Sequence, residues 1–265
     1  MKKRIVIITD CIDVAANEIR ATLISELYKL GKVNKINIEP IVKAKEFSII
    51  NGAFLVRLMA EIYPSQNTVF LVILNALNPN RKQRARIIGE TINGFKFVGA
   101  NTGTLGWLIK DFGIKQIYES SKRGLSGKEF ISFGGKYIHT PIAARVVSGE
   151  KLKELGVRKL ESNFLTYPDL KEGTIVHIDN FGVIKIFGNL LSGLKEGDKT
   201  RIFVNGEEKC IATFTHSMKA LSDGVWVIYP GSSLNNIPEI GRVRKIDAAE
   251  KLGVKIGDTI TIKKY

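Results

Sequence analysis

Two acidic loops and one glycine-rich segment carry residue types suited to binding a polar ligand. The first acidic loop is Thr9-Asp10 with the nearby Asp13, and the second is Asp179-Asn180-Phe181-Gly182. Carboxylates bind ligands by accepting hydrogen bonds and by pairing with positive charge, so the two loops predict one composite polar pocket. The third segment, Phe133-Gly134-Gly135-Lys136, opens a predicted helix with a glycine pair, where backbone can approach a ligand closely.

Alternating strand-like and helix-like segments in the first half of the chain must position these residues. Strands are expected at 5–9, 33–38, 69–74, 95–98 and 114–118, and helices at 14–30, 47–63, 102–111 and 136–148. This alternation predicts a mainly parallel sheet with covering helices. Ligand groups in such sheets gather at the carboxyl ends of the strands, where Asp10, Asp13 and Asn78 are expected.

The pattern changes after the charged stretch 151–172, which carries Pro168 and is interpreted as the connection between two domains. Short strands are then expected at 174–178, 183–187, 200–204, 209–214, 225–229, 242–246 and 259–263. Asn205-Gly206 predicts a tight hairpin turn, because both positions tolerate positive φ. The sequence thus predicts an α/β domain over 1–165 and an all-β barrel domain over 166–265.

The net charge of +14 first suggests a nucleic-acid partner, because a basic surface releases counterions from phosphates. The lysines and arginines are nevertheless spread along the whole chain. They form no arginine-rich run interleaved with aromatic residues, which is the pattern typical of single-strand binding. The sequence therefore argues against nucleic acid as a partner, and RNA binding by the barrel domain is kept only as an alternative.

Cysteine, histidine and apolar patterns set further bounds. Cys11 and Cys210 are far apart in the sequence and form no pair at metal-ligand spacing. The three histidines are also scattered and are interpreted as ordinary buried or surface residues; they are His139, His177 and His216. No metal and no cofactor is therefore expected. The longest apolar runs have strand length, so no membrane span is expected. The first apolar run is too short for a signal-peptide core, which predicts a cytoplasmic protein.

Several motifs together resemble the S-adenosylmethionine hydroxide adenosyltransferase family, which includes the fluorinases and chlorinases. In chain order, the matching segments are Thr9-Asp10 with Asp13, Asn78-Pro79, Gly99-Ala100-Asn101-Thr102-Gly103, Phe133-Gly134-Gly135-Lys136, Asp179-Asn180-Phe181-Gly182 and Gly231-Ser232. The resemblance implies an N-terminal α/β domain, a C-terminal β-barrel, and homotrimers that bind a small adenosyl ligand between domains of adjacent subunits. It also implies in-line attack on the 5′ carbon of the ribose of S-adenosylmethionine, with loss of methionine.

The resemblance assigns roles to several residues of the N-terminal half. Asp13 matches the carboxylate that holds the two ribose hydroxyls, with a helix N-cap as the alternative interpretation. Asp10 belongs to the same acidic loop and is expected at the ligand. Phe47 stands where halogenases carry an aromatic residue beside the ribose, and plain core packing is its alternative.

In the C-terminal half, Asp179 matches the acid that pairs with the methionine ammonium, and a simple turn aspartate is the alternative. Phe181 and Phe214 match aromatic walls of the nucleoside pocket, with core packing as the competing account. Ser232 matches the hydroxyl that receives the methionine carboxylate, or is an ordinary loop serine. Two arginines match the strand at the adenine edge, or lie on a solvated face; these are Arg242 and Arg244.

The departures from the family pattern concern the nucleophile. Family hydrolases carry an aspartate, an arginine and a histidine at positions that hold Asn78, Gln83 or Arg84, and Gly134 here. Asparagine takes up no proton and glycine offers only backbone, so a general base for water is not expected. Halogenases also lack this set, and Gly135 stands where chlorinases have glycine and fluorinases serine. Asn78, Gly134 and Gly135 are therefore the expected catalytic positions.

The resemblance thus implies an enzyme that displaces methionine from S-adenosylmethionine with water or a halide, giving adenosine or a 5′-haloadenosine. Asp13 is expected to orient the ribose, and Asp179 with Ser232 to hold the amino-acid end. The first alternative is a family member that binds an adenosyl ligand without turnover, and the second is RNA binding.

Overall fold

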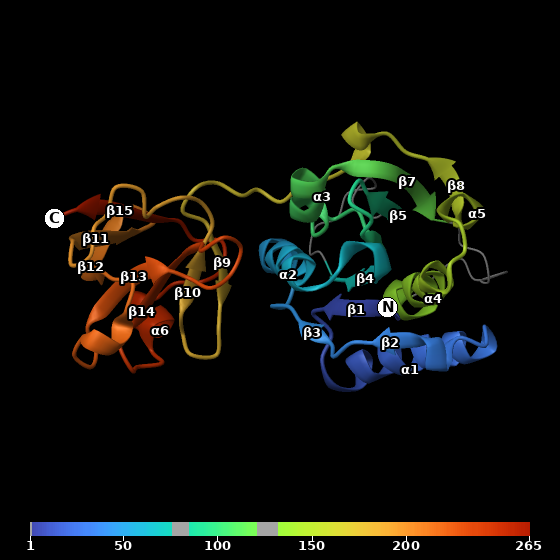
Figure 1. Cartoon of the computed structure of the whole chain (residues 1–265), viewed down its shortest axis with the longest axis horizontal. Helices are drawn as coiled ribbons and strands as arrows, with labels where there is room; N and C mark the ends of the chain where they lie inside the picture. Colours follow the sequence, from blue (N-terminus) through green and yellow to red (C-terminus); the bar gives the residue numbers. More distant parts are fainter. Residues whose placement is uncertain (1, 76–84, 121–131) are drawn as a thin grey trace. The chain divides into compact units, whose positions relative to one another are not determined.

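The computed structural model describes residues 2–75, 85–120 and 132–265. The chain divides into two units, Met1–Pro168 and Asp169–Tyr265 (Figure 1). The predicted position of the domain boundary was between residues 165 and 166. Each unit is built around a sheet of its own.

The N-terminal unit contains a sheet of eight strands. They are β1 (Lys3–Thr9), β2 (Ile36–Ile38), β3 (Val42–Lys43), β4 (Thr68–Ile73), β5 (Arg86–Thr91), β6 (Lys96–Ala100), β7 (Ile114–Ser120) and β8 (Gly156–Lys159). The helices are α1 (Asp13–Lys29), α2 (Ile49–Ile62), α3 (Gly106–Phe112), α4 (Thr140–Ser148) and α5 (Leu152–Leu155). Short helical turns are η1 (Val33–Lys35), η2 (Ser65–Asn67), η3 (Gly135–His139) and η4 (Ser162–Phe164).

The strand order is β2-β1-β4-β6-β5-β7-β8, and β3 also pairs with β1. Strands β2, β3 and β4 run parallel to β1, and β6 runs parallel to β4. In contrast, β5 is antiparallel to β6 and β7, and β8 is antiparallel to β7. The chain leaves β1 toward β2 on one side and later returns to β4 on the other. The order of strands therefore reverses at β1, which makes the carboxyl ends of β1 and β4 a topological switch point.

Helices cover both faces of this sheet (Figure 1). On one face, α1 and α4 pack against alternate residues of β1 and β4, including Ile5, Ile7 and Leu71, all fully buried. On the other face, α2 and α3 meet through Phe54 and Trp107, whose ring centroids are 6.3 Å apart. Because both faces are buried, the central strands are continuous apolar runs, as expected for parallel sheet.

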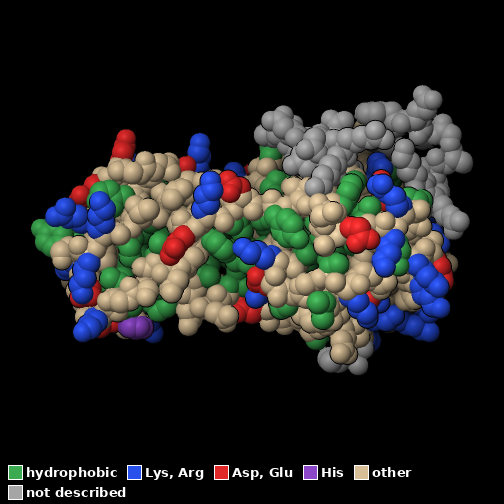
Figure 2. Space-filling view, turned by 90° about the horizontal axis from the view of Figure 1, so that it is seen from above, with side chains coloured by type: hydrophobic (Ala, Val, Ile, Leu, Met, Phe, Trp, Pro, Cys, Tyr) green, Lys and Arg blue, Asp and Glu red, His purple; other side chains and the backbone are tan. Residues whose placement is uncertain are grey.

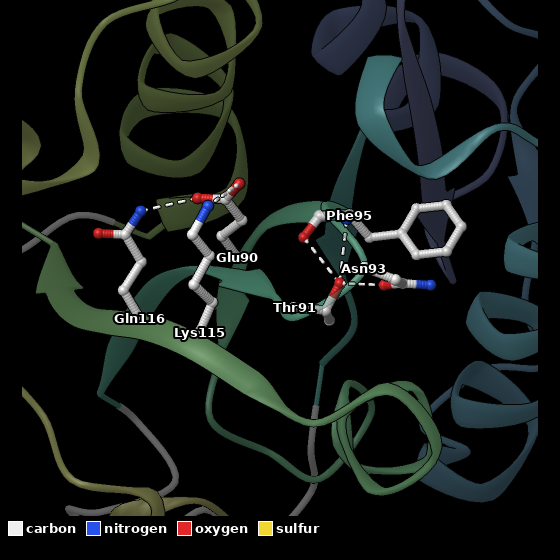
Figure 3. A network of polar contacts seen from close by, with 6 residues as sticks. All are labelled: Glu90, Thr91, Asn93, Phe95, Lys115 and Gln116. Carbon is white, nitrogen blue, oxygen red and sulfur yellow. Dashed lines mark hydrogen bonds and ion pairs between the residues drawn. The ribbon is translucent and has the colours of Figure 1, made fainter.

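Polar contacts fix the position of β5 (Figure 3). Thr91 Oγ1 donates to Asn93 Oδ1 at 2.6 Å and accepts from the Phe95 amide at 3.0 Å, which stabilises the turn from β5 to β6. Glu90 accepts from Gln116 Nε2 at 2.7 Å and pairs with Lys115 at 3.3 Å, both on β7. These contacts join β5 to both of its neighbours.

The C-terminal unit is a curled sheet of seven strands with one short helix, α6 (Ala248–Leu252), and one helical turn, η5 (Met218–Ala220). The strands are β9 (Ile175–Ile178), β10 (Ile184–Ile186), β11 (Lys199–Val204), β12 (Glu207–Phe214), β13 (Trp226–Pro230), β14 (Pro238–Arg242) and β15 (Ile260–Lys264). Their order is β15-β11-β12-β13-β14-β10-β9. A bridge between Thr174 and Thr259 joins the segments just before β9 and β15, so the two ends of this order meet.

The predicted fold class is confirmed: an α/β sheet with covering helices precedes an all-β unit with a curled sheet. Asn205 and Gly206 adopt positive φ between β11 and β12, as their turn chemistry requires. The strand predicted at 242–246 is wrong, because β14 ends at Arg242 and Arg244 has a φ of 49°. Strands β3, β5 and β8 were not predicted, and neither was the part of β14 before Arg242.

The surface carries both signs of charge. Lys and Arg side chains are spread over both units on the face shown in Figure 2, and Asp and Glu lie among them. Within the described parts of the chain, no helix combines the length and apolar character needed to cross a bilayer.

Candidate functional site

Asp10 organises the switch point between β1 and β4. It follows the last residue of β1, and its side chain is 9% exposed. Its Oδ2 accepts hydrogen bonds from the backbone amides of Phe47 and Asn75, each at 3.1 Å. One carboxylate therefore joins the loops that follow β1, β3 and β4. Charge-assisted bonds of this kind are stronger than those between neutral groups.

The loop that presents Phe47 is held by a second buried side chain. Asn51, which is 1% exposed, accepts from the Lys45 amide at 2.8 Å through Oδ1. Ser48 caps α2 by accepting from the Asn51 amide at 3.2 Å. The backbone before α2 is thus fixed on both sides of Phe47.

Asp13 and Phe47 are both held in the left-handed region, with φ of 48° and 59°. Residues other than glycine rarely adopt this conformation, which costs about 1 kcal/mol or more and often marks functional sites. The Asp13 side chain is exposed, and Phe47 is 46% exposed. Core packing is therefore the wrong interpretation for Phe47. The N-cap interpretation of Asp13 is also wrong, because Ile12 occupies the cap position and no side chain caps α1.

The glycine pair lies in the helical turn η3, which leads directly into α4. A Cβ at Gly135 would lie 2.5 Å from Ile73 Cγ2 at the end of β4, so only glycine allows this approach. η3 has π-helical geometry, which is rare and often found at functional sites. Gly135 is thereby placed against the end of β4, and Asp10 binds the Asn75 amide just beyond that end. Asn78 lies outside the described residues.

Two residues near this edge were not predicted as functional. Arg86 begins β5 and pairs with Ala100, the last residue of β6, so it lies at the same edge of the sheet. His139 ends the turn η3, and its side chain is 7% exposed. Burial, with Arg86 nearby, lowers the pKa of His139 to about 4, so its imidazole is neutral at pH 7. Neither residue stands in a recognisable motif, and only burial reveals them.

In the C-terminal unit, Asp179 closes the turn between β9 and β10. Its Oδ1 accepts from the amides of Phe181 at 2.9 Å and Val183 at 3.0 Å. The turn interpretation of Asp179 is therefore confirmed for this oxygen, while no described residue donates to Oδ2. Phe181 is 59% exposed, so core packing is the wrong interpretation for it. Gly182 has a φ of 71°, and a Cβ there would overlap the Ile246 carbonyl.

Ser232 is exposed in the loop between β13 and β14. The loop that carries Ser232 follows Pro230, which pairs with Pro238 at the start of β14. The turn that carries Asp179 precedes Val183, which lies beside Gly241 near the end of β14. Asp179 and Ser232 therefore lie near opposite ends of β14, about 10 Å apart along the strand. A ligand group that touches both must lie along β14.

A buried ion pair lies between these two ends. Lys185 on β10 pairs with Glu239 on β14, and their side chains are 12% and 7% exposed. Burial is the main cause that raises the pKa of Tyr229, and Glu239 adds to it. This pair was not predicted, because the sequence alone does not show that the two charges face each other across the sheet.

The remaining predicted residues pack in the core or form ion pairs within the C-terminal unit. Phe214 belongs to the core of the curled sheet and is 4% exposed, which supports its alternative interpretation. Arg242 binds both carboxylate oxygens of Asp247 at 2.6 Å. Arg244 pairs with Asp223 at 2.5 Å. The two arginines are therefore paired rather than simply solvated, and they do not share a strand.

A family model supports the resemblance seen in the motifs. The model for the SAM hydroxide adenosyltransferase N-terminal domain matches residues 5–156, which is more than half of the chain. The chain belongs to the SAM hydroxide adenosyltransferase family. The matched range of this family member includes the loops around Asp10, the glycine pair and both unpredicted residues, Arg86 and His139.

One curated relative and two solved structures are similar to this chain. An (R)-S-adenosyl-L-methionine hydrolase from Methanocaldococcus jannaschii is 24% identical over 205 residues, which cover 73% of this chain and 69% of the relative. The crystal structure of an uncharacterized conserved protein from Thermotoga maritima matches with a TM-score of 0.82 at 22% identity, over 98% of this chain and 100% of that one. A conserved hypothetical protein from Thermus thermophilus matches with a TM-score of 0.71 at 17% identity, over 99% and 100%. These two likenesses establish the fold alone.

Proposed function

We propose that this protein binds S-adenosylmethionine and displaces methionine from the 5′ carbon of the ribose with water or a halide ion. The products are methionine and either adenosine or a 5′-haloadenosine. Family membership and the relative described as an S-adenosylmethionine hydrolase support this substrate class. The structural observation that carries the proposal concerns Asp13 and Phe47. Both side chains are exposed, and both residues have backbones in the left-handed region. Both lie beside the switch point of the sheet, where Asp10 holds the loops.

In this proposal the N-terminal unit binds the ribose. The exposed Asp13 carboxylate offers two acceptor oxygens to the two ribose hydroxyls, and the Phe47 ring offers an apolar surface beside the sugar. Asp10 acts as a positioning residue, because its bonds to two backbone amides fix the loops and leave its buried side chain little contact with solvent.

The amino-acid end of the substrate is assigned to the C-terminal unit. Asp179 has one oxygen engaged in its own turn and one left to pair with the methionine ammonium. Ser232 donates its hydroxyl to the methionine carboxylate, and the exposed Phe181 ring offers apolar surface close to Asp179. The cleft shared by the two domains, the homotrimer and the cytoplasmic location stay predictions.

The reaction needs positioning more than it needs a base. A lone pair of the nucleophile forms the bond to the 5′ carbon while the carbon–sulfur bond breaks, and sulfur keeps the bonding electrons, so methionine leaves as a neutral thioether. Attack by water also releases one proton to solvent, whereas attack by a halide moves none. Gly134 and Gly135 offer only backbone to the nucleophile, so catalysis here rests on alignment and exclusion of water.

Product analysis tests the proposal. The purified protein is incubated with S-adenosylmethionine in sodium chloride and, separately, in sodium gluconate, and the products are separated by chromatography. Adenosine in both salts indicates water as the nucleophile, and 5′-chloroadenosine in chloride alone indicates a halide. Asp13→Ala should lose the product, whereas Glu26→Ala on the same helix, where Glu26 pairs with the exposed Lys29, should retain it. Unchanged S-adenosylmethionine in every condition would rule out turnover.

A second candidate function is binding of an adenosyl ligand without turnover. It is favoured by Gly134, which supplies no side chain at the position where family hydrolases carry histidine. Calorimetry separates the two candidates: heat of binding without product supports the binding protein, and product formation excludes it. Absence of both binding and product would contradict both candidates.

A further inference from the structure

Most of the net positive charge belongs to the N-terminal unit. Residues 1–168 contain 26 of the 40 lysines and arginines but only 14 of the 26 aspartates and glutamates, which gives a net charge of +12. Residues 169–265 contain the other 14 basic and 12 acidic residues, which gives +2. A partner attracted by positive charge should therefore bind the N-terminal unit rather than the all-β unit.

Lysines from two segments meet where β1 and β2 begin. Lys3 is the first residue of β1 and pairs with Ile36, the first residue of β2. Lys2 and Lys35 directly precede these two residues, and their side chains are exposed. Because the two strands are parallel neighbours, these lysines lie together at the amino-terminal edge of the sheet.

The turn after α1 adds a further lysine to this edge. Lys29 is the last residue of α1, and the amide of Lys32 donates to the Leu27 carbonyl at 2.8 Å. This bond holds the turn against the end of the helix. The helical turn η1 then leads directly from Lys32 to Lys35.

The end of α4 brings a third segment to the same edge. A Cβ built at Gly149, the residue after α4, would lie 3.0 Å from Lys3 Nζ. Lys151 and Lys153 follow within four residues of Gly149, and both side chains are exposed. The three segments are far apart in the sequence, so the spread of charge along the chain gave no sign of this cluster.

The clustered positive charges are not neutralised by nearby acids. We call them the amino-edge lysines; they are Lys2, Lys3, Lys32, Lys35, Lys151 and Lys153. None of the six forms an ion pair within the described ranges of the chain. Two neighbouring acids are paired with other cations, Glu26 with Lys29 and Glu150 with Arg145. Repulsion among unpaired like charges destabilises the folded chain, and a polyanion bound to them would remove this repulsion.

We propose that the amino-edge lysines bind the phosphate backbone of a nucleic-acid duplex without selecting its sequence. A duplex carries about one negative charge per 1.7 Å of its axis, so several ammonium groups can contact phosphates at once. Lysine is a point charge and lacks the rigid fork with which arginine recognises base edges. The cluster is built from lysines rather than from aromatic side chains, on which single strands stack, and this favours a duplex.

The amino-edge lysines are separate from the proposed adenosyl site. Lys3 begins β1, and Asp10 follows the last residue of the same strand. The two residues are therefore about 23 Å apart along the strand direction. Duplex binding does not depend on the proposed function, and turnover of S-adenosylmethionine should not depend on the amino-edge lysines.

Binding of duplexes to the full chain tests the proposal. Fluorescence anisotropy is measured with labelled duplexes of about 24 base pairs, of DNA and of RNA, each in two unrelated sequences, between about 50 and 200 mM sodium chloride. Contacts from all six lysines would give a slope of log K against log salt concentration of about −5. Binding of either kind of duplex, with similar affinity for both sequences, supports the proposal.

Three outcomes would overturn the proposal. The first is absence of duplex binding at low salt, and the second is binding with a slope near zero. The third is binding to only one of the two sequences. Vesicles of phosphatidylserine are tested in parallel, because an anionic membrane also attracts lysines. Binding to vesicles without binding to duplexes belongs to the first outcome and would identify a membrane surface instead.

Matched double variants separate the cluster from the net charge. Lys35→Gln with Lys151→Gln removes two exposed amino-edge lysines. This variant should reduce the steepness of the slope by about 2 and weaken binding roughly tenfold or more at about 0.1 M salt. Lys219→Gln with Lys255→Gln removes two exposed lysines of the C-terminal unit and should bind like the wild type. Equal weakening in the two double variants would contradict the assignment.

Discussion

Replacing His139 with phenylalanine should flatten the pH dependence of stability between pH 6.5 and pH 4. Burial, with a smaller contribution from Arg86, lowers the pKa of His139 from 6.5 to about 4 in the folded chain. The unfolded chain therefore binds more protons than the folded chain in this range. The stability of the wild type is complete above pH 6.5 and is lost as the pH falls toward 4.

The lowered pKa of His139 sets the size of this effect. A change from 6.5 to about 4 spans 2.5 pH units. Each unit corresponds to about 1.4 kcal/mol, so protonation of His139 should remove about 3 kcal/mol of unfolding free energy. Phenylalanine has a similar volume and carries no titrating group, so His139→Phe should not show this component.

Urea unfolding at several pH values between 4 and 7 measures the difference. It is followed for both proteins in the same buffer at the same ionic strength. His177 also has a pKa lowered by burial, but it is present in both proteins and cancels in the comparison. Glu196, whose pKa is lowered to about 2 mainly by its bond to Thr215, acts only below pH 4.5. Parallel stability curves for the two proteins would refute the reasoning.

Three further predictions follow from other contacts. Asp10→Ala should reduce the unfolding free energy by roughly 2–3 kcal/mol in urea titrations, because two backbone amides lose a charged acceptor. Gly182→Ala should lower Tm far more than Gly193→Ala. A Cβ at Gly182 would overlap the Ile246 carbonyl, whereas a Cβ at Gly193 meets no atom within 4 Å. The backbone strain should be similar in the two variants, because φ is 71° at Gly182 and 79° at Gly193. Thr215→Val should raise the pKa of Glu196 from about 2 toward 4.5 in an NMR titration, because the Thr215 hydroxyl is the main cause that lowers it.

Each of these predictions has an outcome that contradicts it. A stable Asp10→Ala protein would show that the three loops are held by other contacts. Equal Tm values for the two glycine variants would mean that the Ile246 carbonyl moves aside at little cost. An unchanged pKa in Thr215→Val would assign the effect to His216 instead, which also bonds to Glu196.

The sequence predicted the central strands and helices of the N-terminal unit because burial on both faces gives continuous apolar runs. β5 was missed, because its sequence begins with a charged residue, Arg86, and carries Gly89 in its middle. The strand predicted at 242–246 covers residues that alternate between charged and apolar at Arg242, Val243 and Arg244. That alternation instead belongs to a turn in which Arg242 reaches back to Asp247.

The candidate site was only partly predictable. Asp10 and Asp13 could be found because they follow a buried strand, where parallel sheets collect ligand groups. The Asp10 side chain is buried beneath the loops, whereas the Asp13 side chain is exposed. This difference depends on the backbone conformation, which could not be predicted from the sequence. His139 could not be predicted, because the burial that lowers its pKa depends on how the rest of the chain packs around it.

The bridge between Thr174 and Thr259 has a consequence for the order in which the chain folds during synthesis. The ring of strands in the C-terminal unit joins its first segment to its last, so it cannot close until residues beyond 259 have left the ribosome. The sheet of the N-terminal unit is complete at Lys159, about a hundred residues earlier. Domains generally fold as units in the order of synthesis, so the first sheet can form while the β-ring is still open.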